Sequence, residues 1–242
     1  MSQEKVTFTI DGTKVTGVKG QTVMEAADAA GIYIPRLCWH KDLPSGGNCR
    51  ICTVMVNGRP AGSCLFPADN GLVVENNTKQ LKEWRCRVVE MHLVEGNHYC
   101  PSCEASGECE LQALGYYTEL LTPTFPYLRP KFEVDASHPD IYIDRDRCIL
   151  CGRCIRASEF LDGKSVFSFE GRGIQKRISV NAVHNLGETD IVVSDRAATI
   201  CPTGALVIKR RGYRIPVGKR RFDKHPIGWE IEKKKKGSTQ SP

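Results

Sequence analysis

The twelve cysteines of this 242-residue chain constrain its fold more than any other feature. Eleven of them form three groups, which lie apart from one another along the sequence. Set one is Cys38, Cys49, Cys52 and Cys64; set two is Cys100, Cys103 and Cys109; set three is Cys148, Cys151, Cys154 and Cys201. The chain must therefore bring each group together around something that cysteine binds.

The redox state of the cellular compartment decides whether those cysteines form disulfides or bind metal. No apolar stretch resembles a secretory leader or approaches the roughly 18 residues that a membrane span needs. We therefore expect a cytoplasmic protein without membrane contact. Thiols stay reduced in that compartment, so clustered cysteines there bind metal or carry out redox chemistry instead of forming disulfides.

Set one has the spacing C-x10-C-x2-C-x11-C, with the segment Ser45-Gly46-Gly47-Asn48 between its first two members. An iron–sulfur cluster needs backbone amides close to its sulfides, and glycine permits that approach. Set one therefore predicts a [2Fe-2S] site.

Set three has the bacterial ferredoxin spacing C-x2-C-x2-C, followed by the remote pair Cys201-Pro202. Ferredoxins with two clusters carry a fourth cysteine three residues after the third, followed by proline. Ser158 and Glu159 stand at those places here. We therefore expect a single [4Fe-4S] cluster at set three.

Set two, C-x2-C-x5-C, has no fourth cysteine nearby, and His98 stands two residues before Cys100. Imidazole is an acceptable ligand for iron. The candidates for the fourth position are His98, His92 or an iron corner without a protein ligand. A neutral ligand in place of a thiolate should raise the reduction potential of a [4Fe-4S] cluster, as histidine does in Rieske centres.

Structural zinc sites are the main alternative for such cysteines. They usually pair two C-x2-C knuckles, and none of the three sets has that form. Iron–sulfur clusters are therefore the better interpretation. Cys86 remains unassigned, and we expect it to be a small buried hydrophobe on an apolar helix.

Five arginines stand close to the cysteines in the sequence: Arg50, Arg145, Arg147, Arg153 and Arg156. Cations near a negatively charged cluster favour its reduced form. An ordinary solvated surface is the alternative interpretation for each of them.

The pattern of apolar residues predicts an α+β fold with a β-grasp, ferredoxin-like domain over residues 1–78. A capping box, Thr22 with Glu25, opens its short helix, and Gly31 ends it. We expect its strands at residues 5–10, 14–18, 51–56 and 71–75.

A helical segment with the second ligand set follows over residues 79–121, then a proline-rich linker over 122–139. Its first helix, 79–94, is apolar on two stripes and is expected to be buried on both, and a short helix is expected at 108–117. The third unit, 140–225, is a ferredoxin-like [4Fe-4S] domain with strand signals at 141–143, 165–170, 178–183, 191–193 and 205–209. The charged tail, 226–242, is expected to be disordered.

The net charge of +6 comes from the end of the chain. Residues 209–242 hold 12 of the 34 Lys and Arg residues with three acidic residues, whereas the preceding part is slightly acidic. A basic segment raises the alternative of nucleic-acid binding by a cluster-bearing repair protein. The acidic body predicts no basic groove, so we expect no nucleic acid and assign the basic segment to partner docking or to solvent.

The order of the three sets, with Asn97-His98-Tyr99-Cys100 and Gly107-Glu108-Cys109 in the middle segment, resembles a known family. Over about residues 1–225 the chain is similar to the small diaphorase subunits of soluble NAD-reducing [NiFe]-hydrogenases. It also resembles the beginning of the largest peripheral iron–sulfur subunit of respiratory complex I and of NAD-dependent molybdenum formate dehydrogenases. Those two continue into a large further domain, whereas this sequence stops at Pro242, so the hydrogenase type is the better match.

The resemblance implies a subunit that relays electrons between a flavin-containing NAD(H) subunit and the small and large hydrogenase subunits. It implies one [2Fe-2S] and two [4Fe-4S] clusters here, with FMN and NAD on the partner. Complex I relatives place the histidine ligand where this chain has Gly96, so His98 follows the Asn-His-x-Cys form of the hydrogenase type. The equivalent subunit of a formate dehydrogenase, a bifurcating hydrogenase or a complex I-like NADH dehydrogenase is the alternative.

Nothing in the sequence predicts a catalytic site on this chain. Gly171-x-Gly173 lacks the third glycine of a dinucleotide fingerprint, and there is no P-loop. The paired C-x2-C motifs of a nickel site are also absent. We therefore expect outer-sphere electron transfer without a substrate-binding residue.

Overall fold

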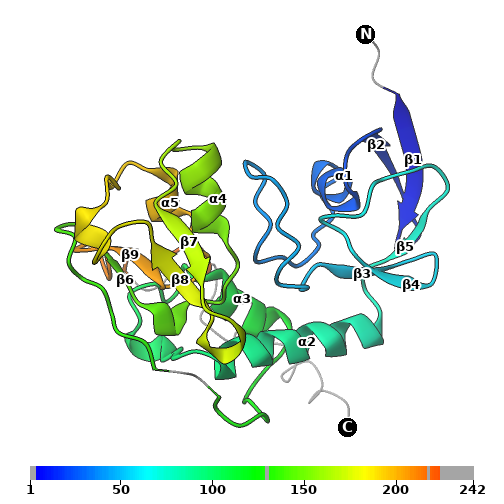
Figure 1. The fold of residues 1–242 in the computed structure, drawn as a ribbon. Coiled ribbons are helices and arrows are strands. Elements are labelled where there is room, and N and C mark those ends of the chain that lie inside the picture. Colours follow the sequence, from blue (N-terminus) through cyan, green and yellow to red (C-terminus); the bar gives the residue numbers. More distant parts are fainter. Residues whose placement is uncertain (1–3, 129–130, 217–218, 224–242) are drawn as a thin grey trace, which may run out of the picture.

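The structure, a computed structural model, describes residues 4–128, 131–216 and 219–223, and the expected disordered tail lies outside them. Figure 1 shows two lobes, one built from the N-terminal strands and one from the C-terminal half, with two helices running beneath both. No helix in the described part of the chain is long and apolar enough to cross a membrane.

The N-terminal lobe is a five-stranded sheet in the order β2-β1-β5-β3-β4. β1 pairs parallel with β5, and the other neighbours are antiparallel. Helix α1, Val23–Ala29, begins with the predicted capping box of Thr22 and Glu25. The strands are β1 (Lys5–Ile10), β2 (Thr13–Val18), β3 (Thr53–Val56), β4 (Arg59–Gly62) and β5 (Val73–Glu75). The predicted α+β class with a ferredoxin-like N-terminal domain is confirmed.

Strand β4 is the element of this lobe that the sequence did not predict. Pro60 lies inside it, and proline normally argues against a strand because it cannot donate to the ladder. β4 is an edge strand that pairs with β3 alone, across the Asn57-Gly58 turn. An edge position leaves one side of the strand without ladder partners, so proline is tolerated there.

Helix α2 has the predicted bounds, Lys79–Val94, but the expectation that it is buried on both stripes is wrong. Trp84 and Met91 are 38% and 42% exposed, whereas Leu81 and Val89 are fully buried. The buried face also holds two charged side chains, Arg85 and Glu90. The apolar pattern could not reveal this, because charged residues take part of the face that packs on the core.

Arg85 joins α2 to the N-terminal sheet. Its guanidinium donates to the backbone carbonyls of Ile51, Thr53 and Asn76 at 3.3, 2.8 and 2.8 Å, and to Asn76 Oδ1 at 2.8 Å. At the other end of α2, the carboxylate of Glu90 accepts hydrogen bonds from the backbone N–H groups of Thr124 and Phe125. These contacts fix α2 between the sheet and the first residues of the linker, 122–128.

The C-terminal lobe contains two small antiparallel sheets, β6 with β9 and β7 with β8. Their strands are β6 (Ile141–Ile143), β7 (Phe167–Glu170), β8 (Arg177–Val180) and β9 (Leu206–Ile208). The helices from α3 onward are α3 (Glu110–Tyr117), α4 (Arg153–Phe160) and α5 (Arg196–Thr199). Single 3-10 turns lie at Cys100–Ser102, Arg145–Arg147, Gly173–Gln175 and Leu186–Glu188.

The strand predicted at residues 191–193 is wrong, and helices α4 and α5 were not predicted. Residues 191–193 have no ladder partner, and the N–H of Val192 donates instead to the carboxylate of Asp195 at 2.9 Å. Ile191 is nevertheless buried in the core of this lobe. Its burial explains the strand-like apolar signal without a strand.

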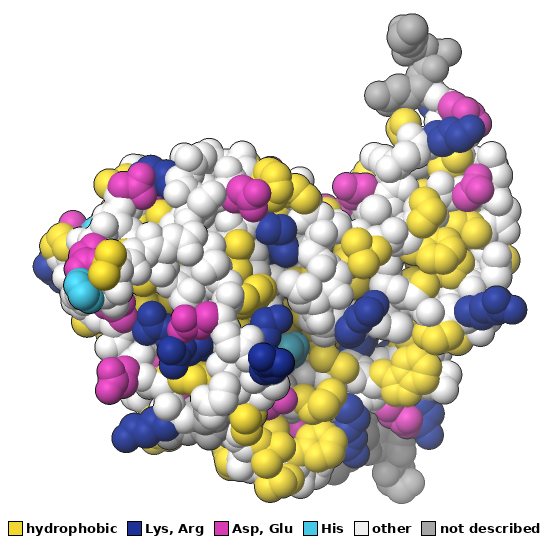
Figure 2. Space-filling model, in the orientation of Figure 1, with side chains coloured by type: hydrophobic (Ala, Val, Ile, Leu, Met, Phe, Trp, Pro, Cys, Tyr) yellow, Lys and Arg dark blue, Asp and Glu magenta, His cyan; other side chains and the backbone are white. Residues whose placement is uncertain are grey.

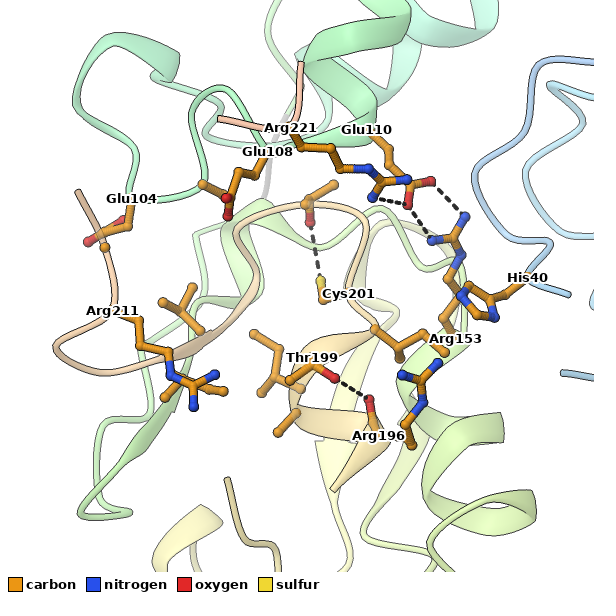
Figure 3. Close-up of a pocket in the computed structure, with 18 residues that line it drawn as sticks. His40, Glu104, Glu108, Glu110, Arg153, Arg196, Thr199, Cys201, Arg211 and Arg221 are labelled. Atoms are coloured by element: carbon orange, nitrogen blue, oxygen red, sulfur yellow. Dashed lines mark hydrogen bonds and ion pairs between the residues drawn. The ribbon is translucent and has the colours of Figure 1, made fainter. Parts of the chain in front are cut away.

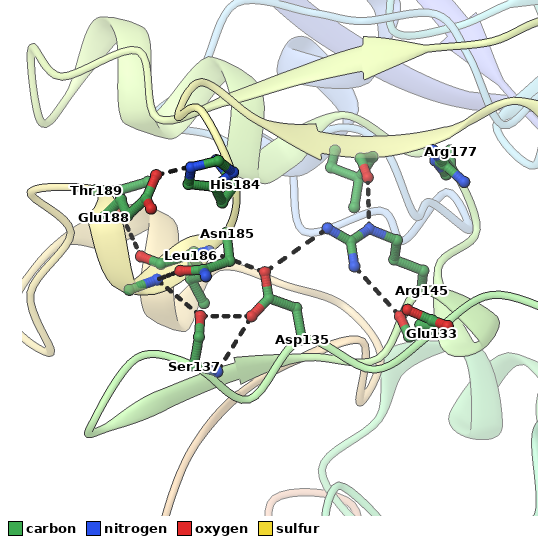
Figure 4. A network of polar contacts seen from close by, with 12 residues as sticks. Glu133, Asp135, Ser137, Arg145, Arg177, His184, Asn185, Leu186, Glu188 and Thr189 are labelled. Atoms are coloured by element: carbon green, nitrogen blue, oxygen red, sulfur yellow. Dashed lines mark hydrogen bonds and ion pairs between the residues drawn. The ribbon is translucent and has the colours of Figure 1, made fainter.

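The described part of the linker, residues 122–128 and 131–139, contains no helix or strand. Its first part contacts α2 through Glu90 and Val94, and its second part is docked on the C-terminal lobe (Figure 4). Asp135 forms an isolated β-bridge with Ile143 and accepts a hydrogen bond from the N–H of Leu186 at 2.8 Å. Arg145 approaches the same carboxylate at 3.9 Å and donates to the carbonyl of Ile178 at 2.9 Å. Asp135 therefore ties the linker to two later segments of the lobe.

We predict that Arg85→Met lowers the stability of the iron-loaded chain. The substitution leaves three buried carbonyl groups without donors, a loss of about 3 kcal/mol, or roughly 8 °C in Tm for a protein of this size. Thermal unfolding followed by circular dichroism measures the effect. Arg59→Met on the exposed edge strand is the control and should change stability by about 0.5 kcal/mol or less. Equal effects of the two substitutions would show that the buried hydrogen bonds of Arg85 do not stabilise the fold.

Candidate iron–sulfur centres

All four cysteines of set one are buried in the N-terminal lobe. The backbone N–H of Cys38 points at Cys49 Sγ, 3.4 Å away. Hydrogen bonds from the thiols of Cys49 and Cys64 lower the pKa of Cys38, and a hydrogen bond from Cys64 lowers that of Cys52 to about 6. The four sulfur atoms therefore lie close enough to share protons, and the sequence-predicted residues are brought together.

The glycine-rich segment of set one serves close packing against the other lobe. A Cβ atom at Gly46 would overlap the guanidinium of Arg156. Gly47 has a φ of 67°, and a Cβ atom there would be too close to Leu65. The positive φ favours glycine at position 47, and a larger residue at position 46 would displace the Arg156 guanidinium, which comes from the C-terminal lobe.

Set three lies at the beginning of α4 and in the loop before β9. Leu150 and Gly152 adopt positive φ values of 53° and 68°, which turn the backbone between the cysteines. The N–H of Leu150 points at Cys148 Sγ at 3.4 Å. Burial and the charges of the other thiols of the set raise the pKa of Cys148 to about 12 and also raise those of Cys151 and Cys154. This mutual influence, with Cys201 included, places all four sulfur atoms near one another.

The three cysteines of set two line one small cavity together with His98. Cys109 caps α3 with its sulfur, which accepts a hydrogen bond from the N–H of Gln112 at 3.4 Å. Burial raises the pKa of Cys109 to about 12. Ser106, Gln112, Arg147 and Gly204 complete the lining. A three-cysteine, one-histidine donor set is thus brought together by residues 98–109.

The ring of His98 is held like that of a metal ligand. Its Nε2 atom is buried without a hydrogen-bond partner. A hydrogen bond joins the ring to the backbone of His92. Burial, with the nearby His92 and Arg147, lowers the pKa of His98 to about 4, so the ring is neutral at pH 7. A ligating histidine commonly donates its other ring N–H to a carbonyl group, which fixes its orientation.

His92, the alternative ligand, does not line the set-two cavity. Its ring hydrogen-bonds to the backbone of Cys49 in set one, and its Nε2 atom is buried without a partner. A Cβ atom at Gly96 would overlap the ring of His98 and lie 2.7 Å from the carbonyl oxygen of Asp146. Gly96 therefore leaves room for His98, which we keep as the proposed ligand.

The residues present fit iron–sulfur clusters. Buried thiols ionise only when a nearby positive charge compensates them, and iron supplies that charge. The position of His98 is the second sign, because its unpartnered Nε2 belongs to a ring that lines the same cavity as the three cysteines. In the described part of the chain, no three His, Cys, Asp or Glu residues are grouped so as to hold a single metal ion.

Sets one and three touch across the boundary between the lobes. Arg156 donates to the carbonyl oxygen of Cys38 at 2.6 Å, and Asn48 donates from Nδ2 to the carbonyl oxygen of Cys151 at 3.2 Å. The sequence indicated Arg156 as a neighbour of cysteines but gave no signal for Asn48. These are direct contacts between the residues that carry the two ligand sets.

Arg153 connects all three cysteine-bearing segments. Its guanidinium forms a bidentate ion pair with Glu110, next to Cys109, at 2.9 and 2.8 Å. It also donates to the carbonyl oxygen of Trp39, next to Cys38, at 2.9 Å. Arg153 itself precedes Cys154, and its exposed fraction is only 2%. Sequence reasoning missed Glu110, whose partner is 43 residues away.

A cleft of about 440 Å³ opens beside Cys201 (Figure 3). Its rim carries both signs of charge, and Arg221 and Arg153 both approach the carboxylate of Glu110 there. The titratable side chains of its lining include His40, Glu104, Glu108, Glu110, Arg153, Arg196, Arg211 and Arg221. Lys, Arg, Asp and Glu side chains are likewise interspersed on the face shown in Figure 2.

Cys86 stands apart from the ligand sets, but it is less buried than expected of a small buried hydrophobe. It is partly exposed on α2, and its thiol hydrogen-bonds to Thr118. Partial burial raises its pKa. Arg50 is exposed, so it fits the alternative of a solvated side chain, whereas Arg153 is buried.

Three family models match successive parts of the chain. Residues 3–79 match the 2Fe-2S iron-sulfur cluster binding domain, residues 85–122 the iron-sulfur binding region of NADH-ubiquinone oxidoreductase G, and residues 141–208 the 4Fe-4S single cluster domain. These matches, on the fold described above, define an iron–sulfur protein with 2Fe-2S and 4Fe-4S binding domains.

Comparison with full-length proteins shows to which family of iron–sulfur proteins the chain belongs. The chain is 41% identical over 223 residues to the NAD-reducing hydrogenase HoxS subunit gamma of Cupriavidus necator, covering 90% of this chain and 93% of that protein. It therefore belongs to the family of that gamma subunit. A chain of the crystal structure of an NAD+-reducing [NiFe]-hydrogenase in the H2-reduced state superimposes with a TM-score of 0.88, at 48% identity, over 91% of this chain and 94% of the other.

More distant relatives match this chain over only part of their own length. The mitochondrial NADH-ubiquinone oxidoreductase 78 kDa subunit of Candida albicans is 34% identical over 214 residues, which are 87% of this chain but 29% of that protein. The predicted resemblance to the complex I subunit is confirmed.

We predict about ten iron atoms and ten acid-labile sulfides per chain after anaerobic purification. His98→Ala should lower both toward about six, because set two loses its fourth ligand. His92→Ala and Cys86→Ala should leave them at about ten. Iron and sulfide assays of the four proteins measure this. If His92→Ala lost iron while His98→Ala kept all of it, His92 and not His98 would be the fourth ligand of set two.

We predict that removal of iron loosens the ligand segments before the N-terminal hairpin. Without iron, the thiols of set three stay neutral in buried positions and the donor set around His98 has no partner, so these segments lose their central contact. Hydrogen exchange should rise first in α4 and in residues 98–109. The β1–β2 hairpin, which carries no ligand, is the internal control. Unchanged exchange in α4 after iron removal would contradict a structural role for the metal.

Proposed function

We propose that this chain is the electron-relay subunit of an NAD-reducing [NiFe]-hydrogenase and holds three clusters. The [2Fe-2S] site is set one, and the [4Fe-4S] sites are set three and set two with His98. Bound clusters would supply one-electron transfer without bond making or breaking. The observation that carries the proposal is the adjacency of the three ligand sets within one packed structure.

The contacts support a series in which set three lies between the other two. Asn48 and Arg156 join the segments of sets one and three, and Arg147 joins those of sets two and three. The ligands of all three sets also meet in one hydrophobic cluster, to which Cys38, Cys49, Cys109 and Cys151 belong. Electronic coupling falls steeply with distance, so packing of ligand segments against one another favours transfer along this series.

The same proposal assigns the remaining chemistry to partners. A flavin-containing diaphorase subunit would hold FMN and NAD, and the hydrogenase small and large subunits would activate hydrogen. The family membership and the likeness to a chain of the hydrogenase crystal structure support this assignment. We place the complex in the cytoplasm and assign no substrate-binding residue to this chain.

We predict that Cys151→Ser, in the assembled complex, stops hydrogen-dependent reduction of NAD+ while dye-linked hydrogen oxidation continues. Set three is the middle of the series, so its loss should separate the two ends without touching either active site. Both activities are measured on the same preparation, with Cys86→Ser as the control. Retention of NAD+ reduction after verified loss of four irons would contradict the relay. Failure of the chain to purify with hydrogenase and flavin subunits would contradict the assigned complex.

A further inference from the structure

Arg147 is shared by the segments of sets two and three. Its Nη1 atom donates a hydrogen bond to Cys103 Sγ, 3.7 Å away, and the side chain lines the set-two cavity. Arg147 also directly precedes Cys148 of set three. The guanidinium thus reaches a thiolate of one set from the backbone of another.

Several contacts hold this guanidinium in position. Nη1 is 2.7 Å from the carboxylate of Glu104, and Nε is 2.8 Å from that of Asp144. The carbonyl oxygen of Arg147 accepts a hydrogen bond from Thr203 at 2.9 Å, and the Thr203 hydroxyl lies 3.6 Å from Cys201 Sγ. Arg147 is therefore fixed on both sides, and its side chain is 21% exposed.

Gly204 lies against Cys103 and leaves room for these contacts. A Cβ atom at Gly204 would lie 2.9 Å from Cys103 Sγ and 3.6 Å from Arg147 Nη1. A side chain at this position would press on the Cys103 sulfur, whereas the guanidinium would be in ordinary contact with it. The absence of a side chain at Gly204 thus permits close approach of the Cys201 loop to set two.

A positive charge and an N–H···S hydrogen bond stabilise the more negative of two redox states. Reduction adds one negative charge, so both effects raise the reduction potential of the site. The proposed replacement of a thiolate by the neutral ring of His98 acts in the same direction. The two effects are independent, because His98 would act as a ligand and Arg147 acts as a neighbouring charge.

We propose that Arg147 is a positioning residue that raises the reduction potential of the site at set two, with Glu104 and Asp144 partly offsetting its charge. The proposal rests on the cluster assignment within the proposed function. Arg147 binds no substrate and takes no part in bond making.

Redox titration of the intact complex, followed by electron paramagnetic resonance, tests this. The set-two signal is recognised by nitrogen hyperfine coupling from its histidine. Arg147→Met should lower the ratio of reduced to oxidised set two about tenfold at a fixed potential, which is about 59 mV for one electron. Arg147→Lys keeps the charge and should shift the potential less. Arg196→Met, a cation of the neighbouring cleft that pairs with Asp42, is the matched control and should not shift it.

Glu104→Gln gives an independent test of opposite sign. Removal of the carboxylate leaves more of the Arg147 charge uncompensated, so the potential of set two should rise. It also decides the matter if Arg147→Met fails to retain ten irons. An unchanged set-two potential in Glu104→Gln, or in fully loaded Arg147→Met, would overturn the proposal. If the shifts occur but the chain does not purify with hydrogenase subunits, the inference stands and the assigned complex falls.

Discussion

Burial of cysteine sulfur beside compensating positive charge is the constraint on which the rest of the structure depends. A buried thiol stays protonated unless a cation is near, and the raised pKa values of Cys109 and Cys148 reflect that cost. In the proposed sites iron would supply the charge from inside, and neighbouring arginines supply it from outside. The fold accordingly places Arg147 against Cys103 and Arg153 next to Cys154.

Two arginines of α4 fix how the lobes meet. Arg153 and Arg156 both arise from the first turns of α4, directly at set three, and both donate to backbone carbonyls next to or at Cys38. A buried guanidinium with specific acceptors gives directional constraint that apolar packing lacks. The spacing between ligand sets is therefore determined by residues that also shape the electrostatics of the sites.

The sequence predicted those elements whose signals are local. The hairpin, the Thr22 capping box, the bounds of α2 and the spacing within each ligand set all depend on residues near one another in the chain. The partners Asn48, Glu110 and Thr203 could not be predicted, because each acts through a contact more than 40 residues distant. The apolar periodicity also gave wrong predictions for the buried face of α2 and for residues 191–193. In both places distant contacts decide what is buried.

Shared ligand segments also mean that the three cysteine-bearing units do not behave as independent domains. Cys38, Cys109 and Cys151 belong to a single hydrophobic cluster, although they lie in parts of the chain that match three different family models. A change at one site therefore reaches the backbone of the next through hydrogen-bonded carbonyls. In such an arrangement the distance between sites is a property of the whole chain, and the potential of each site can still be adjusted by a single neighbouring charge.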